Sequence, residues 1–331
     1  MTPRNGLVCG VVLGAVLAAG ACAQEGKPVA PVEAQAGQAG EFATADELLQ
    51  ALEKADEKLE SLTADVRYER TFELQGDRQV RTGKLYFVNG EKGSSAGAGG
   101  KGRKFAVSFE KLQVGEVVRE EPKVYIFDGQ WLVEKLPKEK PPLFIKRQVV
   151  APGQTADPLK IGEGQFPLPI GQKAAEIKER YEVELLPAGA GLEPGKDDDE
   201  EQKATLTNLS KFVAGGAHVK LTPKARYAED EDFTRIDLWY KRDQGGKGGM
   251  LLPRMARTVD KAKNQSVVQL INVQVQRGGE AANTAARVPP EALDTAEPAR
   301  GSGWEVQVVP WQKPAADGAG AKREGPDAGD P

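Results

Sequence analysis

The feature that most constrains this chain is a strict alternation of apolar and polar residues in successive short segments. Between Ala64 and Leu74, apolar side chains such as Val66, Tyr68 and Phe72 alternate with Asp, Arg, Glu and Thr. Successive side chains of a β-strand point to opposite faces of a sheet. A period of two therefore predicts a strand with one buried face and one solvated face.

The same pattern recurs along the chain, which predicts a series of antiparallel strands. Asn89-Gly90 and Asp128-Gly129 are dipeptides favoured in tight hairpin turns, so we expect hairpins at both. In the last segment, Ile271, Val273 and Val275 are predicted to share one face. The further predicted strands cover residues 83–88, 104–110, 124–126, 131–133, 181–186, 218–221, 234–241, 252–259 and 266–276.

Two helices are predicted. Thr44 and Glu47 form a T-x-x-E capping box, which marks a helix start. The apolar residues that follow at spacings of four and three, and so indicate one helix face, are Leu48, Leu52, Ala55, Leu59 and Leu62. A second, shorter helix is expected after Pro169, carrying Ile170, Ala174 and Ile177.

The predicted fold class is mainly β with helices (α+β). About ten strands in one sheet would twist and expose an apolar face, so the sheet is expected to curl. We therefore predict an open, curled antiparallel sheet, or half β-barrel, with the N-terminal helix and the middle helix plugging its concave face.

The ordered patterns form a single predicted domain, residues 42–312. Two low-complexity loops interrupt it, at 90–102 and 192–202, and the acidic run within the second is expected to be solvated. A flexible leader, 24–41, and a disordered tail, 313–331, flank the domain.

The N-terminus has the order of a secretory signal, residues 1–23: a basic residue, an apolar run and small residues. Cleavage after Ala23 would release a soluble periplasmic chain. Alternatively, cleavage after Ala21 would allow Cys22 to carry a lipid anchor; the soluble form is favoured. The two cysteines, Cys9 and Cys22, both lie in this segment, so cleavage after Ala23 leaves no thiol for a disulfide or a metal site.

The charges nearly balance, 45 basic against 49 acidic residues. This balance gives no field that would steer nucleic acid, so a nucleic-acid partner is not expected.

Groups suited to catalysis are scarce. His218 is the only histidine, and its place on the polar side of a strand predicts an exposed or rim position. Gly97, Gly99 and Gly102 match G-x-G-x-x-G without the strand and helix that phosphate binding requires. Asp230, Glu231 and Asp232 are interpreted as a charged turn. We predict no catalytic residue, no metal, no cofactor and no enzymatic activity.

The remaining candidate site is the inner face of the predicted sheet. For any one residue a filled core is the simpler interpretation, but a wide sheet closed by two helices tends to leave a groove for an apolar ligand. The candidate ligand-binding residues are Val66, Tyr68, Phe72, Leu85, Phe87, Phe105, Val107, Phe109, Val124, Ile126, Trp131 and Val133.

Several short segments, taken in order, resemble the LolA family of periplasmic lipoprotein carriers and its relatives of the LolB and RseB type. They are the helix Leu48 to Leu62, the strand Leu62 to Phe72, Gly83-Lys84-Leu85-Tyr86-Phe87, Ile126-Phe127-Asp128-Gly129-Gln130-Trp131-Leu132, Val219-Lys220-Leu221-Thr222-Pro223-Lys224 and Arg254 to Val275. The resemblance covers most of residues 44–290. Trp304 and Trp311 have no counterpart in it.

The resemblance implies a half-open barrel whose concavity takes up acyl chains of lipoproteins or other lipidated ligands, for transport towards the outer membrane. It also implies an inner-membrane release complex and an outer-membrane acceptor as partners, and a monomer. Two alternatives remain: an envelope lipoprotein or sensor module that binds lipid without shuttling, and a hydrolase that uses His218.

Overall fold

The computed structural model describes residues 41–90, 102–151, 173–243 and 249–312. The predicted signal and leader, Gly97 and Gly99 of the glycine motif, Ile170 and the tail lie outside these residues. Within the described ranges, no helix is long and apolar enough to cross a bilayer.

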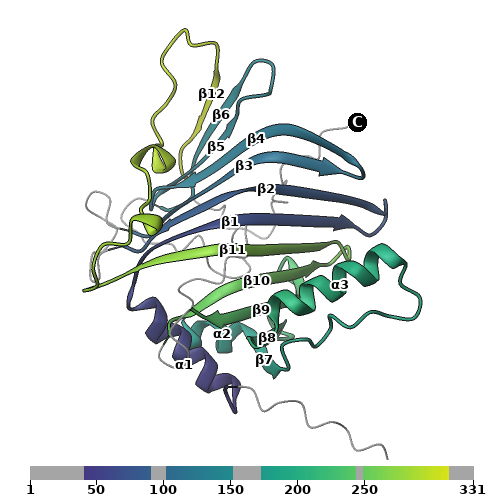
Figure 1. The fold of residues 1–331 in the computed structure, drawn as a ribbon. Helices are drawn as coiled ribbons and strands as arrows, with labels where there is room; N and C mark the ends of the chain where they lie inside the picture. Colours follow the sequence, from purple (N-terminus) through teal and green to yellow (C-terminus); the bar gives the residue numbers. More distant parts are fainter. Residues whose placement is uncertain (1–40, 91–101, 152–172, 244–248, 313–331) are drawn as a thin grey trace, which may run out of the picture. The chain divides into compact units, whose positions relative to one another are not determined.

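Twelve strands form one open sheet in the order β12-β6-β5-β4-β3-β2-β1-β11-β10-β9-β8-β7 (Figure 1). Neighbouring strands pair antiparallel, except that β12 runs parallel to β6. Because β12 and β7 lie at opposite edges, the sheet is not closed into a barrel. The predicted fold class, an open antiparallel half-barrel, is confirmed, with twelve strands instead of about ten.

The strand bounds follow the predicted segments closely in the second half of the chain, where β7 is predicted to the residue. Two strands, β6 and β12, were not predicted. The strands are β1 (Leu59–Phe72), β2 (Asp77–Val88), β3 (Lys104–Val114), β4 (Val117–Phe127), β5 (Trp131–Leu136), β6 (Leu143–Gln148), β7 (Tyr181–Leu186), β8 (Ala217–Pro223), β9 (Phe233–Arg242), β10 (Leu251–Asp260), β11 (Gln265–Arg277) and β12 (Glu305–Val309).

The first helix, α1 (Ala45–Asp56), begins as predicted: the Thr44 side chain accepts a hydrogen bond from the Glu47 N–H. Its predicted end is wrong, because Leu59 and Leu62 belong to β1. The pairing of β1 with β11 shifts register between Leu59 and Ser61. This irregularity allows two leucines three positions apart to be buried in one cluster, which imitates helical spacing.

The acidic run is largely exposed, as expected, but its last two residues begin a helix, α3 (Glu200–Val213), so the predicted loop 192–202 ends at Asp199. Asp199 is its N-cap and forms a reciprocal capping box with Gln202. Carboxylates in the first turn of a helix favour the positive end of its dipole, so the run of like charges is compatible with helix formation. The other helix, α2 (Ala174–Arg180), matches the predicted middle helix.

The predicted hairpin at Asp128-Gly129 is confirmed, since the Asp128 carboxylate accepts hydrogen bonds from the N–H groups of Gln130 and Trp131. At Asn89-Gly90 the strand β2 ends as predicted and β3 is its antiparallel neighbour, but the connection is not a tight turn, because β3 begins only at Lys104. The Asn89 amide instead donates to the carbonyls of Asp56 and Leu59 and ties the end of α1 to the sheet.

We call the face that carries Val66, Leu85 and Phe109 the inner face, and the opposite one the outer face. Apolar residues of α1 and α2, among them Leu48 and Ile177, pack on the inner face over β7 to β10. The predicted positions of these two helices on one face are therefore confirmed.

The outer face has covers of its own. Helix α3 packs there through Leu209 and Val213 against Trp239 and Met255. The C-terminal segment crosses the other half with two 3-10 turns, η2 (Thr284–Ala286) and η3 (Pro290–Leu293). Trp304, unexplained by the sequence, packs there on a small cluster with Phe144 and Val133.

Two backbone features set the register of the central strands. At Asn272, which has a φ of 52°, the pairing of β11 with β1 shifts. The shift gives Leu270 and Val273 a place in the same inner-face cluster, so the prediction that Ile271 shares a face with Val273 is wrong. At Gly83, an added Cβ would lie 1.9 Å from the carbonyl oxygen of Ser108 in β3, so no other residue fits there without moving backbone.

Candidate functional site

The inner face of β1 to β4 and β11 is a continuous apolar surface. Its aromatic members contact one another across strands: the rings of Phe105 and Phe127 lie 5.8 Å apart, and those of Tyr68 and Phe109 lie 6.1 Å apart. The buried members from these strands are Leu59, Leu62, Ala64, Val66, Leu85, Phe87, Phe105, Val107, Phe109, Tyr125, Phe127, Val268 and Leu270.

Eight of the twelve predicted site residues lie on this face. Six of them are members of the buried cluster, and Tyr68 packs against it. Phe72 has the same phase in β1 as Tyr68, because the pairing of β1 with β2 is regular. The eight are Val66, Tyr68, Phe72, Leu85, Phe87, Phe105, Val107 and Phe109.

The other four predicted residues, Val124, Ile126, Trp131 and Val133, lie on the outer face, so their assignment to the inner face is wrong. Ile126 pairs with Ala106 and Val133, and the three share a small outer-face cluster. Residues 124–127 are Val-Tyr-Ile-Phe, apolar at every position, because the C-terminal segment covers the outer face there. Alternation cannot show which residues face inward when both faces of a strand are buried.

The residues that take their place on the inner face are Tyr125, Phe127 and Leu132. Cross-strand neighbours share a face, so Val107, which pairs with Tyr125, gives the phase of β4 once the register is known. The sequence signal that could have found them is the clear alternation in β3, because the residues of β4 that pair with its inner residues must also face inward.

Val124 and Ile126 line a groove of about 290 Å³ on the outer face. The groove lies between the sheet and η3, and its rim includes Lys84, Glu110 and Lys135. The Lys135 ammonium donates to the carbonyl of Asp294 at 2.8 Å, which ties the C-terminal segment to β5.

The apolar part of the inner face is shielded from solvent. Phe87 and Phe109 have exposed fractions of 0 % and 1 %. The main helix contacts on this face within the described ranges lie over β7 and β10, away from these two rings. A hydrocarbon ligand would therefore have to replace existing contacts of these side chains, because no free surface is offered at either ring.

Beyond Gly83 the inner face becomes charged, and we call this part the cationic end. Arg81 is the cross-strand neighbour of Tyr68 and donates to Glu121 at 2.6 Å; Arg119 donates to the same carboxylate at 2.7 Å. Lys123 forms an ion pair with Glu134 at 2.8 Å. The charged members are Arg70, Arg81, Arg119, Lys123, Asp77, Glu121 and Glu134.

Burial and pairing shift the acid–base properties of the cationic end. Burial opposes the negative charge of Glu121, but the hydrogen bond and charge of Arg81 outweigh it, so the pKa of Glu121 lies below its ordinary value. Burial next to Glu134 raises the pKa of Tyr125 far above that of a free phenol, so this hydroxyl remains neutral. The carboxylate of Glu121 is therefore charged and the hydroxyl of Tyr125 neutral at neutral pH.

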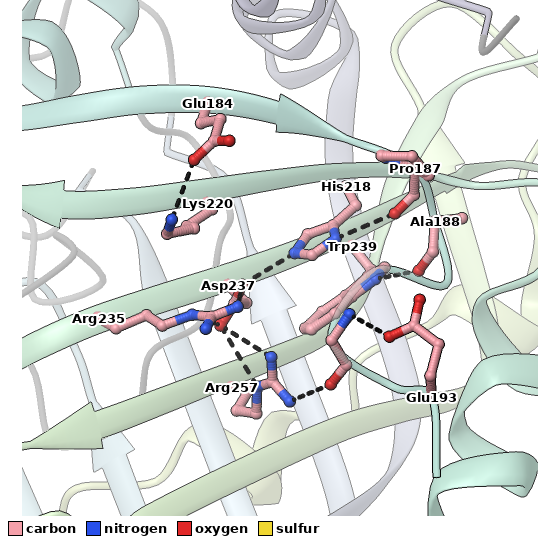
Figure 2. A network of polar contacts seen from close by, with 11 residues as sticks. Glu184, Pro187, Ala188, Glu193, His218, Lys220, Arg235, Asp237, Trp239 and Arg257 are labelled. Carbon is pink, nitrogen blue, oxygen red and sulfur yellow. Dashed lines mark hydrogen bonds and ion pairs between the residues drawn. The ribbon is translucent and has the colours of Figure 1, made fainter. Parts of the chain in front are cut away.

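A second polar cluster lies on the outer face around Asp237 (Figure 2). Its carboxylate is fully buried and accepts hydrogen bonds from His218 at 2.9 Å and from Arg235 at 2.7 and 2.9 Å. Arg257 adds weaker bonds at 3.2 and 3.3 Å. Burial by itself would raise the pKa of Asp237, but these hydrogen bonds outweigh it and lower the pKa to about 2.

His218 is buried, with no exposed surface, so the prediction of an exposed or rim histidine is wrong. Its ring stacks on Trp239 with centroids 4.1 Å apart, beneath the Pro187–Glu193 segment (Figure 2). The two ring nitrogens face a carboxylate oxygen of Asp237 and the carbonyl oxygen of Pro187. Both partners are hydrogen-bond acceptors, so each ring nitrogen faces a polar group within the fold.

Glu231, interpreted from sequence as part of a charged turn, is also buried. It accepts hydrogen bonds from the Tyr181 hydroxyl and from Arg180, each at 2.8 Å. The carboxylate joins the end of α2 to the turn before β9. It is therefore a structural anchor of the α2 end of the sheet.

The part of the chain that the structure describes contains no group of three His, Cys, Asp or Glu residues that could hold a metal ion.

No family model matches the sequence. No curated protein matches it either. Solved structures with a similar fold include a putative outer membrane lipoprotein-sorting protein domain from Vibrio parahaemolyticus: 11 % identity, covering 71 % of this chain and 93 % of that one, TM-score 0.32. A LolA superfamily protein from Nitrosomonas europaea has 11 % identity over 71 % of this chain and 94 % of that one, TM-score 0.28. Pseudomonas aeruginosa MucB, in its complex with MucA, has 14 % identity over 74 % of this chain and 61 % of that one, TM-score 0.30.

Proposed function

We propose that this protein is a periplasmic, non-enzymatic carrier that binds acyl chains of lipoproteins or other lipidated ligands on its inner face and moves them towards the outer membrane. The observation that carries the proposal is the continuous surface of aliphatic and aromatic side chains on β1 to β4 and β11. It extends across five neighbouring strands, while the packing of α1 and α2 is concentrated over β7 to β10.

The physical basis is burial of hydrocarbon. Each CH₂ group that leaves water for an apolar surface contributes about 0.8 kcal/mol, so a long acyl chain needs no polar motif for useful affinity. Part of this free energy is spent in separating side chains such as Phe87 and Phe109 from their present contacts. The resulting affinity is moderate, which suits a carrier that must also release its cargo.

Titration with a lipid tests binding directly. The exported, delipidated protein is titrated with myristoyl lysophosphatidylcholine below its critical micelle concentration, and binding is measured by calorimetry. We expect saturable binding in the wild type, and its loss in Phe87→Glu and Phe109→Glu. Val118→Glu is the matched control, because this residue of β4 is 59 % exposed.

Thermal unfolding of each variant is recorded first, so that loss of binding is distinguished from loss of the fold. A wild-type protein that takes up no lysolipid, and carries no lipid when purified from cells, contradicts the proposal. Binding that survives both inner-face substitutions in folded protein would move the site elsewhere.

A second candidate function is a sensor or tethered envelope lipoprotein that binds lipid without shuttling. The observation that favours it is Cys22 within the N-terminal segment, which offers a lipidation position. Mass spectrometry of the exported chain separates the two: a mature protein starting at Gln24 supports the carrier, whereas a diacylated Cys22 at the N-terminus supports the tethered module.

A further inference from the structure

The charged groups at the cationic end adjoin the apolar part of the inner face. Gly83 pairs with Val66, and Arg81 lies two residues further along β2 on the same face. Two residues of strand span about 7 Å, so a ligand lying on Val66 and Phe109 would reach the guanidinium with its next few atoms.

The cationic end carries more positive than negative charge. Its four cations stand against three carboxylates, Glu121, Glu134 and Asp77 opposite Phe72, a net charge of +1 on this part of the inner face. Glu121 is already held between Arg81 and Arg119, and Glu134 is held by Lys123. Arg70 lies over the Phe72 ring, 4.7 Å from its centroid, with its charge uncompensated by any of these carboxylates.

Arg81 also has an unused donor. Its Nη2 atom bonds to Glu121, while its Nη1 atom is shielded from solvent and has no hydrogen-bond partner among the described residues. The side chain is only 18 % exposed. A buried donor without a partner costs free energy, and an incoming anionic oxygen would remove that cost.

We propose that the cationic end binds the anionic headgroup of a single-chain amphiphile whose acyl chain lies on the apolar part of the inner face. The inference rests on the proposed function and adds the class of ligand: acyl chains attached to a phosphate or carboxylate. Arg81 supplies the primary hydrogen bond, and Arg70 and Arg119 add charge. Lys123 and Glu134 form an ion pair beside Tyr125, which is the cross-strand neighbour of Glu134, and so stabilise the pairing of β4 with β5.

Two probes with the same chain test the headgroup. Myristoyl lysophosphatidylglycerol carries an anionic phosphate, whereas 1-monomyristoylglycerol has the same acyl chain and no charged group. We expect the wild type to bind the anionic lipid about tenfold more tightly, the effect of one hydrogen bond to a charged group. The preference should shrink as sodium chloride is raised, because part of it is electrostatic. Arg81→Gln should remove most of the preference, measured as the ratio of the affinities for the anionic and the uncharged lipid.

Lys111→Gln is the matched control, because it removes one positive charge from β3 at a position paired with Thr82, away from the inner face. Its headgroup preference should equal that of the wild type. Arg70→Gln serves as a second variant should Arg81→Gln fail to fold, and we expect it to weaken the preference in part.

The outcomes separate the two proposals. Equal affinity of the wild type for both lipids, or an unchanged preference in Arg81→Gln, overturns the headgroup site and leaves the acyl-binding function intact. Failure of the wild type to bind either lipid overturns both. A preference lost equally in Lys111→Gln would indicate general charge attraction and would also overturn the site.

Discussion

The two polar clusters of this protein lie on opposite faces of one sheet and differ in how completely their hydrogen bonds are made. Around Asp237, three cationic or ring groups converge on one carboxylate, and His218, Trp239 and Arg257 also bond to carbonyls of the covering segment. At the cationic end, the Nη1 atom of Arg81 has no hydrogen-bond partner within the described part of the chain and lies beside an apolar surface.

The difference indicates different roles. A fully satisfied buried cluster gains nothing from a ligand, so the Asp237 cluster is structural: it joins β8, β9 and β10 to the Pro187–Glu193 segment. An incompletely satisfied cluster is stabilised by a partner of the right charge. Stability measurements should therefore respond mainly to the first cluster, and ligand measurements mainly to the second.

The largest effect is expected for Asp237→Asn. The substitution leaves two arginines without their buried counter-charge, and removing one partner of a buried ion pair costs about 3–5 kcal/mol. Urea unfolding followed by circular dichroism measures the change in the free energy of unfolding. Asp65→Asn is the control, since Asp65 pairs with Lys84 at a half-exposed position, and such pairs contribute less than about 1 kcal/mol. Equal effects of the two substitutions would contradict the comparison.

His218→Ala should cost about 2–3 kcal/mol, because it removes a hydrogen bond to a charged group and the ring that stacks on Trp239. The same urea titration measures it. Binding of myristoyl lysophosphatidylcholine should be unchanged, because the ring lies on the outer face. A loss of lipid binding in folded His218→Ala would mean that the two clusters are coupled.

Acid should weaken the protein through Asp237. The pKa of this carboxyl is lowered from about 3.8 to about 2 in the folded state. The unfolded chain therefore binds the proton first as the pH falls, so the stabilisation is complete above about pH 4 and is lost as the pH falls towards about 2, a total of about 2 kcal/mol. Unfolding free energies at pH 5 and pH 3, compared between wild type and Asp237→Asn, measure it; parallel pH dependences would exclude Asp237 as a cause.

The smallest effect on stability is expected for Arg81→Met. The substitution removes the bond from Arg81 to Glu121 but leaves that carboxylate bonded to Arg119, so the free energy of unfolding should fall by only about 1 kcal/mol. A loss as large as that of Asp237→Asn would show that Arg81 is a structural anchor, and the contrast between the two faces would disappear.

Alternation in the sequence predicts the inward-facing residues best in strands that have one buried and one solvated face. In β1, alternation identifies Val66 and Tyr68 as inner residues, and the structure agrees. In β4, residues 124–127 are apolar on both sides, so the phase cannot be derived and Ile126 was assigned to the wrong face. The outer face of β4 is buried by the C-terminal segment, which is far away in sequence, so local alternation does not reveal this burial.

Local irregularities account for other differences. The register shift after Leu59 gave strand residues the spacing of a helix, and the shift at Asn272 reversed the phase of β11. The helix α3 was missed because a run of five acidic residues resembles a solvated loop, although Asp199 has the capping partner Gln202 three positions on. His218 was misplaced because its burial depends on Asp237 and on the Pro187–Glu193 segment, which packs on it.

The glycine at position 83 has a further consequence. It lies where the apolar part of the inner face meets the cationic end, and the β3 backbone approaches it too closely for any side chain. Close packing of main-chain atoms therefore fixes the distance between the apolar part and the cationic end. For the proposed ligand, substitution of an apolar inner-face residue would change which acyl chains are preferred. The spacing between acyl chain and headgroup would stay the same, because the backbone sets it.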